Sequence, residues 1–111
     1  MTSFPDSFDA ASYEAFAEGL DYDSAMRMSE GGTWLYDRPG GPALVTVTGC
    51  EYRVFEKAHV WRVRMERPNG METVADLRLD EIPGRMRRVA SRSAGTLSLY
   101  DGTEVRFGVV A

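Results

Sequence analysis

From residue 33 onward, apolar residues alternate with polar ones, and turn-forming residues interrupt the alternation at short intervals. A period of two is typical of strands with one buried face, because successive side chains point to opposite sides of a sheet. Trp61, Val63 and Met65 share a face in this way, and the turn residues Pro68-Asn69-Gly70 follow shortly after them. The pattern predicts a series of hairpins and therefore a mostly antiparallel β fold.

The hairpin over residues 58–79 contains enough alternation to predict its register. A two-residue Asn69-Gly70 turn would set Val63 opposite Asp76, whereas a three-residue loop sets Val63 opposite Ala75. Because the hydrophobic pattern determines register, we expect the longer loop, closed by Gly70 in the left-handed conformation. The same loop pairs Trp61 with Leu77 and Arg62 with Asp76.

The remaining strands are less regular. We expect strands over residues 33–37, 43–48 and 50–55, a turn over 38–42, and a bulge at Gly49. For the last hairpin, around Asp101-Gly102, a loop one residue longer than a two-residue turn sets Leu99 opposite Val105 and Leu97 opposite Phe107. Residues 85–93 fit either a strand or a short helix.

Residues 7–28 have the spacing of a helix rather than of a strand. Ser7 or Asp9 can cap its start, and Gly19 is a plausible stop or kink. Asp21 or Asp23 would then cap a second short helix. The apolar residues that fall near one face at helical spacing are Phe8, Ala11, Ala15, Phe16 and Leu20, and the second helix would hold Ala25, Met26 and Met28.

Together these elements predict one domain of the mostly-β class with an N-terminal helical segment (α+β). We expect an acidic helical segment over residues 1–30 and a body over residues 31–111, built as a small antiparallel β-barrel or sandwich of about six strands. Residues 1–30 carry seven acidic side chains against Arg27 alone, within a net charge of −4 for all 111 residues. This balance disfavours a dedicated nucleic-acid binder.

The residue types that carry most catalysis are nearly missing. The chain has one His (His59), one Cys (Cys50) and one Lys (Lys57), and no known motif surrounds them. We therefore expect no enzyme activity and interpret Cys50 as a small buried apolar residue. We expect no metal or other cofactor either, since the Asp21-x-Asp23 pair lacks the glycine and the closing Glu of a calcium loop.

Two features of the sequence suggest contacts with other molecules. Arg85, Arg87, Arg88 and Arg92 form the one basic cluster, which could hold phosphate or an acidic protein surface. Nucleic acid is less favoured, because Lys is absent from the cluster and no aromatic residues are interleaved with it. A solvated loop is the other interpretation, and under either one reversing these charges would barely change the melting temperature. The aromatic residues Trp34, Tyr36, Tyr52, Phe55 and Trp61 are expected in the core, whereas one or two exposed Trp or Tyr among them would mark an interface hot spot.

The layout of the chain resembles the small head–tail joining proteins of tailed bacteriophages, the head-completion, adaptor and stopper proteins of the neck. Three stretches carry the resemblance: an Ala-rich lead from Phe16 to Met26, the stretch from Val74 to Leu79 followed by Ile82-Pro83, and the hairpin from Gly95 to Phe107 around Asp101-Gly102. Members of this family begin with a helical segment and continue as a small β-barrel or sandwich.

The resemblance implies a structural protein that joins head or portal to tail, forms a homo-oligomeric ring on assembly, and resides in the virion, or in the cytoplasm of the infected bacterium beforehand. Composition suggests a monomer in free solution, with no membrane span and no sequence-specific nucleic-acid recognition. Candidate interface residues are Asp21, Asp23, Arg85, Arg87, Arg88 and Arg92. Two rival functions stay open: a small acidic inhibitor that binds a host protein, and a ligand-binding β-barrel or small enzyme.

Overall fold

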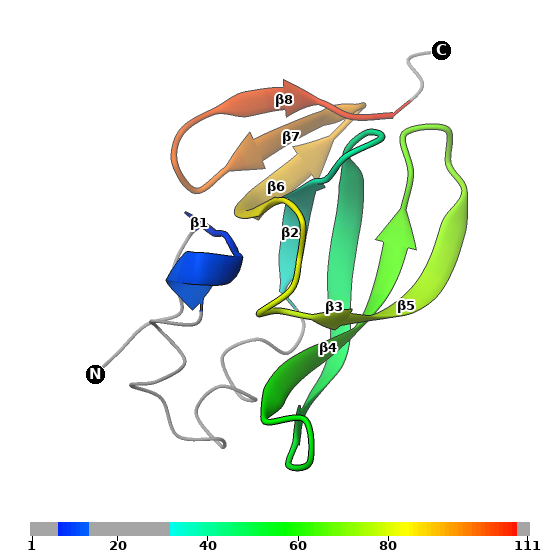
Figure 1. Ribbon diagram of the computed structural model, residues 1–111. Helices are drawn as coiled ribbons and strands as arrows, with labels where there is room; N and C mark the ends of the chain where they lie inside the picture. The colour runs from blue at the N-terminus through cyan, green and yellow to red at the C-terminus, as the bar shows by residue number, and fades with distance from the viewer. Residues whose placement is uncertain (1–6, 14–31, 109–111) are drawn as a thin grey trace.

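The computed structural model describes residues 7–13 and 32–108, most of which lie in one curled antiparallel sheet that forms half a barrel (Figure 1). The strand order is β5-β4-β3-β2-β6-β7-β8, and β1 pairs with β6. The mostly antiparallel β class is confirmed, with more strands than expected. The strands are β1 (Ser7–Phe8), β2 (Thr33–Asp37), β3 (Ala43–Arg53), β4 (Ala58–Glu66), β5 (Glu72–Arg78), β6 (Arg85–Ser93), β7 (Thr96–Leu99) and β8 (Glu104–Arg106).

Strand β2 lies at the centre of the sheet and is buried on both faces. Trp34 and Tyr36 share the face predicted for them, and Leu35 points to the other. All three side chains are at most 3% exposed. A strand with two buried faces needs apolar residues at consecutive positions, which explains why this segment is apolar without interruption at its middle.

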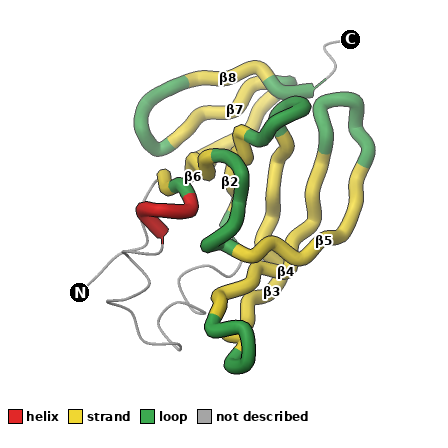
Figure 2. Tube along the Cα trace, in the orientation of Figure 1, coloured by secondary structure: helices red, strands yellow, loops and turns green. Residues whose placement is uncertain are grey.

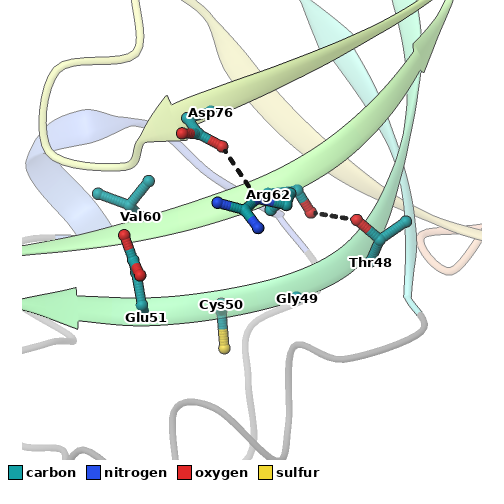
Figure 3. A pocket seen from close by; sticks show the side chains of 7 residues that line it. All are labelled: Thr48, Gly49, Cys50, Glu51, Val60, Arg62 and Asp76. Atoms are coloured by element: carbon teal, nitrogen blue, oxygen red, sulfur yellow. Dashed lines mark hydrogen bonds and ion pairs between the residues drawn. The ribbon is translucent and has the colours of Figure 1, made fainter.

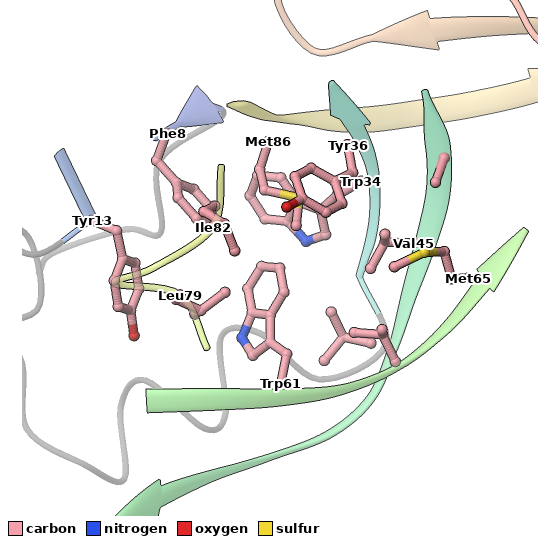
Figure 4. Packing of buried hydrophobic residues seen from close by; sticks show 13 residues of the cluster. Phe8, Tyr13, Trp34, Tyr36, Val45, Trp61, Met65, Leu79, Ile82 and Met86 are labelled. Atoms are coloured by element: carbon pink, nitrogen blue, oxygen red, sulfur yellow. The ribbon is translucent and has the colours of Figure 1, made fainter. Parts of the chain in front are cut away.

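The larger hydrophobic core lies on the face of the sheet that carries β1 and the turn over residues 79–84 (Figure 4). The rings of Phe8, Trp34 and Trp61 contact one another there, with centroids 5.3–5.7 Å apart. Tilted and edge-on aromatic contacts at this distance add to the stabilisation from burial. The buried members are Phe8, Tyr13, Trp34, Tyr36, Ala43, Val45, Val47, Trp61, Val63, Met65, Leu79, Ile82 and Met86.

A second, smaller core lies on the opposite face. It is formed by Leu35 and Leu44 from the central strands and by Leu97, Leu99 and Phe107 from the last hairpin. A register shift between Val89 and Ser91 in β6 precedes this hairpin. Since a bulge bends a strand and increases its twist, it allows β7 and β8 to fold over the second face.

The β4–β5 hairpin has the predicted register. Val63 pairs with Ala75, Trp61 with Leu77 and Arg62 with Asp76. The Arg67 N–H donates to the Met71 carbonyl at 2.8 Å, which leaves a three-residue loop, and Gly70 has a φ of 91°. The left-handed glycine at the third loop position is therefore confirmed.

The predicted register of the last hairpin is wrong by two residues. Leu97 pairs with Val105, and the Leu99 N–H donates to the Thr103 carbonyl. The loop consists of residues 100–102 and places Gly102 third, with a φ of 89°. The third position of the loop needs a positive φ, which glycine tolerates, so Gly102 determines where the loop lies. Because side chains alternate with a period of two, the shift of two residues leaves every side chain on its expected face.

Strand β3 is longer than predicted. It runs from residue 43 to residue 53, and the expected bulge is confirmed by a register shift between Val47 and Gly49. A turn over residues 54–57 follows, so the expected strand over 50–55 ends two residues early. Residues 85–93, for which strand and helix were both open, form strand β6.

The start of the chain differs from the predicted helix. Ser7 and Phe8 form β1, and only residues 10–13 are helical within the described part of this region (Figure 2). Asp9 is the cap, because its carboxylate accepts a hydrogen bond from the Ser12 N–H at 2.8 Å. With the helix beginning after β1, Tyr13 is buried and Ala11 is exposed, contrary to the expected face.

The other predictions for the N-terminal region fall on residues 14–31, which lie outside the described residues. They include Ala15, Phe16 and Leu20 of the expected apolar face, the stop at Gly19, and the second helix capped by Asp21 or Asp23. Within the described ranges, no helix is both long enough and apolar enough to cross a membrane.

Candidate functional site

The face of β3, β4 and β5 that lies opposite the larger core, here called the outer face, contains a shallow hollow of about 180 Å³ (Figure 3). The bulge at Gly49 lies at its edge, and no atom lies within 4 Å of the position that a Cβ would take there. The lining residues are Thr48, Gly49, Cys50, Glu51, Val60, Arg62 and Asp76.

Ion pairs cross the outer face beside the hollow. Arg53 contacts Glu51 at 2.7 Å and Asp76 at 3.1 Å, and Arg62 lies 3.5 Å from Asp76. The hydrogen bond to Glu51 is the main reason why the pKa of Arg53 is raised above its ordinary value. Since these groups are 36–64% exposed, they add little to stability, and their charges balance one another across the face.

Cys50 and His59 do not face each other across the β3–β4 pair. Cys50 pairs with Trp61, whereas His59 pairs with Tyr52. The Cys50 sulfur points away from the carboxylates of the hollow (Figure 3). His59 lies in ring contact with Tyr52, at 4.9 Å between centroids, and with Tyr13, at 5.8 Å.

Burial governs the titration of this aromatic group. Desolvation lowers the pKa of His59 below its ordinary value, although the nearby Asp80 carboxylate opposes the shift. Burial likewise raises the pKa of the Tyr13 hydroxyl. Both groups are therefore neutral near pH 7, which suits ring packing rather than charge-dependent binding.

The four arginines of the predicted basic cluster are distributed along β6 and contact different elements. Arg87 donates from Nε and Nη2 to the two carboxylate oxygens of Asp37 of β2, at 2.8 and 3.2 Å. Arg85 donates to the Ser7 hydroxyl of β1 at 2.9 Å. These two side chains connect β6 to its neighbours, so each has a structural contact that the sequence did not indicate.

The other two arginines lie near the last hairpin. The Arg88 guanidinium stacks on the Tyr100 ring, 4.5 Å from its centroid. Arg92 forms an ion pair with Glu66 of β4 at 2.7 Å and lies 5.9 Å from the centre of the Phe107 ring. Arg85 and Arg92 are the more exposed of the four, while Asp21 and Asp23, their expected counterparts, lie outside the described residues.

Several exposed apolar side chains were missed as candidate sites. Phe55, expected in the core, is fully exposed at 103%, and its neighbour Val54 is 70% exposed. Both lie in the β3–β4 turn, because β3 ends at Arg53. The signal in the sequence was an apolar pair directly before Glu56-Lys57, where turn residues are usually polar. Among the described residues, the other large apolar side chains that are exposed are Met71, Val74 and Tyr100.

In the part of the chain that the structure describes, no group of three or more His, Cys, Asp or Glu side chains is placed so that it could hold a metal ion. The arrangement instead offers exposed apolar hairpin ends and a charge-balanced outer face. None of the protein-family models, curated proteins or solved structures compared with the chain matches it.

Proposed function

We propose that this chain is a structural assembly protein of a phage-like particle, which joins the head and its portal to the tail by protein–protein docking. It acts in the virion and is present in the cytoplasm of the infected bacterium before assembly. Two observations support the proposal: the resemblance of three sequence stretches to head–tail joining proteins, and an apolar anchor on a projecting hairpin.

The apolar anchor is the observation that carries the proposal. Val54 and Phe55 lie at the end of the long β3–β4 hairpin, which projects at the lower end of the sheet in Figure 1. Burying a Phe side chain in a partner's pocket stabilises a complex by about 1.5–3 kcal/mol. Aromatic anchors of this kind dominate the binding energy of many interfaces, so the β3–β4 turn is a docking element.

In this mechanism the β body packs against neighbouring copies in a ring, while the β3–β4 turn and the acidic segment over residues 1–30 seat on a portal or tail ring. The exposed Arg85 and Arg92 then provide positive charge for the acidic segment of the next copy. Such polar contacts set register and specificity more than affinity.

The two rival functions receive less support. A nucleic-acid mimic needs a contiguous acidic face, but the outer face interleaves Glu51 and Asp76 with Arg53 and Arg62. A ligand-binding site is usually a cavity of about 300–1,000 Å³. The hollow on the outer face has about 180 Å³ and is open to solvent.

The test is deletion of the gene from the genome that carries it, followed by electron microscopy of the particles. We expect DNA-filled heads and finished tails that remain separate, and restoration of joined particles by the unchanged gene. A Phe55→Ser variant should restore joining poorly, because it removes the apolar anchor without disturbing a buried contact. Glu56→Gln, a change in the same turn that leaves the apolar pair in place, should restore joining fully.

Two results would contradict the proposal. Joined particles in normal numbers without the gene would exclude a role in joining. Full restoration by a soluble Phe55→Ser variant would exclude the β3–β4 turn as the docking element.

A further inference from the structure

Strand β5 forms one edge of the sheet, and within residues 7–13 and 32–108 only β4 pairs with it. The Arg67 N–H donates to the Met71 carbonyl, and the Leu79 N–H donates to the His59 carbonyl. Because backbone groups alternate in direction along a strand, the odd-numbered residues of β5 bond to β4. The N–H and C=O groups of Glu72, Val74, Asp76 and Arg78 therefore point to the outer edge.

This edge has only part of the usual protection against pairing, namely the charged side chains of Glu72, Asp76 and Arg78. It is seven residues long, contains no Pro and no Lys, and carries Val74 with its side chain 77% exposed. Natural sheets commonly shorten, bulge or charge such edges to prevent association with another strand. The opposite edge, β8, is only three residues long. The contrast identifies β5 as the edge available for an added strand.

We propose that β5 of one molecule pairs antiparallel with β5 of a second copy of this chain, about a two-fold axis at Ala75. The outward-pointing N–H and C=O groups of the two β5 strands can bond to each other only when even-numbered residues of one copy face even-numbered residues of the other. Among the registers that satisfy this condition, centring on Ala75 aligns the whole strand, Glu72 with Arg78 and Val74 with Asp76. The two sheets then become one continuous sheet with about eight additional backbone hydrogen bonds.

The side-chain charges favour this register. Glu72 of each copy lies opposite Arg78 of the other, so opposite charges meet at both ends of the pair. Within its own molecule Arg78 already binds Asp80 at 2.8 Å and lies 3.5 Å from Glu81, so Glu72 adds to these contacts and does not replace them. Within one molecule Glu72 is less well placed, because it faces Glu66 on β4, whose carboxylate is bound by Arg92 at 2.7 Å. Arg64 and Arg92 line the same hollow as Glu72, but no ion pair of Glu72 exists among the described residues, so pairing brings Arg78 of the second copy directly opposite this carboxylate.

The centre of the strand is compatible with pairing as well. Asp76 faces Val74 of the second copy, but its charge is already balanced by Arg53 at 3.1 Å and Arg62 at 3.5 Å. Each Val74 lies directly opposite Asp76 of the other copy and diagonal to the other Val74, so the added strand covers part of its side chain. The exposed apolar area of both Val74 side chains thus decreases on pairing.

The inference departs from the monomer expected from composition, which took no account of a partly protected edge strand. It does not depend on the proposed role in particles. An interface of one strand per copy is small, so association should be weak and reversible. We expect a monomer–dimer equilibrium at concentrations of roughly 10 µM to 1 mM.

Disulfide trapping tests the register directly. In a Cys50→Ser background, Ala75→Cys places two thiols opposite each other at a non-hydrogen-bonded site, where Cα atoms lie about 4.5 Å apart. Air oxidation should therefore link two chains covalently. Thr73→Cys is the matched control, because residue 73 faces Leu77 of the second copy and not itself, and it should link far less.

Sedimentation of the unchanged protein tests the pairing without any engineered residue. A concentration-dependent dimer should appear, and Glu72→Arg should weaken it by ~10-fold or more, since it sets Arg opposite Arg78. Glu104→Arg on β8, with the same change of charge, should leave it unaltered. The inference is overturned if no dimer forms at ~1 mM, if Thr73→Cys links as readily as Ala75→Cys, or if Glu104→Arg abolishes the dimer and Glu72→Arg does not.

Discussion

Gly84→Ala should be strongly destabilising although it adds a single methyl group. A Cβ at this position would lie against the Asp37 carbonyl oxygen, 2.7 Å from the Asp37 carbonyl carbon and 3.0 Å from the Arg38 Cα. All three are backbone atoms, which cannot rotate away as a side chain can. The turn before β6 must therefore separate from the end of β2.

The expected magnitude follows from two opposing effects. Replacing Gly by Ala where φ permits it stabilises a protein by about 0.4–1 kcal/mol, through the unfolded chain. Overpacking usually costs about 1–3 kcal/mol and more when the backbone must move. Separation here also disturbs the Asp37–Arg87 contact. We expect a net loss of about 3 kcal/mol, which lowers the melting temperature by roughly 12–24 °C in a domain of this size.

Urea unfolding followed by tryptophan fluorescence measures this loss, because Trp34 and Trp61 are both buried in the core. Gly49→Ala is the control, since a Cβ at that position meets no atom within 4 Å and its φ is not left-handed. It should leave the protein as stable as before or more stable by up to about 1 kcal/mol, because the same effect on the unfolded chain is not opposed by a clash. A Gly84→Ala protein as stable as the Gly49→Ala control would refute the close approach of the two segments.

Three further predictions concern stability and titration. Gly70→Val should cost about 1–3 kcal/mol in urea unfolding because a β-branched residue is strained at a φ of 91°, and an unchanged stability would contradict the loop geometry. Arg87→Glu should lower the melting temperature by several degrees because it breaks the fork with Asp37, whereas Arg106→Glu, an exposed change on β8, should not; equal effects would contradict the structural role of Arg87. Burial should hold the pKa of His59 below 6.5 in an NMR titration, in which the single imidazole is unambiguous, and a value above 6.5 would contradict its placement. As the pH falls, the unfolded chain then protonates His59 at a higher pH than the folded protein does. The His59 contribution to stability should therefore fall as the pH drops below about 6.5, and it should level off below the pKa of His59 in the folded protein.

The charge reversal of the arginine cluster shows where sequence reasoning needed the structure. From the sequence, reversing the charges of Arg85, Arg87 and Arg88 was expected to block particle assembly with little effect on the melting temperature. The structure places Arg87 against Asp37 and Arg88 over the Tyr100 ring. Asp37 is 50 residues from Arg87 in the sequence and Tyr100 is 12 residues from Arg88, and no local pattern indicates contacts over such separations.

The β4–β5 hairpin was predictable because its evidence is local. Alternation over Trp61, Val63 and Met65 and a nearby Gly70 determine face and loop together. The last hairpin was harder, because registers that differ by two residues give the same faces. Only the requirement that Gly102 occupy the third loop position separates them.

The candidate sites were less predictable than the strands. Phe55 was assigned to the core because aromatic residues usually lie there, and its exposure depends on β3 ending at Arg53. The partly protected edge of β5 depends on strand order, which links segments far apart in sequence. Hydrophobic periodicity indicates which residues face a core and contains little information on which strand lies outermost.

The central claim is that the β3–β4 turn docks the protein at a head–tail junction. Site-specific photocrosslinking from position 55 in assembled particles tests it most directly, because Phe55 is fully exposed and a photoreactive phenylalanine analogue disturbs no buried contact. The account predicts a crosslink from this position to a portal or tail-ring protein, absent when the probe is placed at Glu104 on β8. Purified particles that lack the protein, or that contain it with no crosslink from position 55 to either ring, would contradict the account.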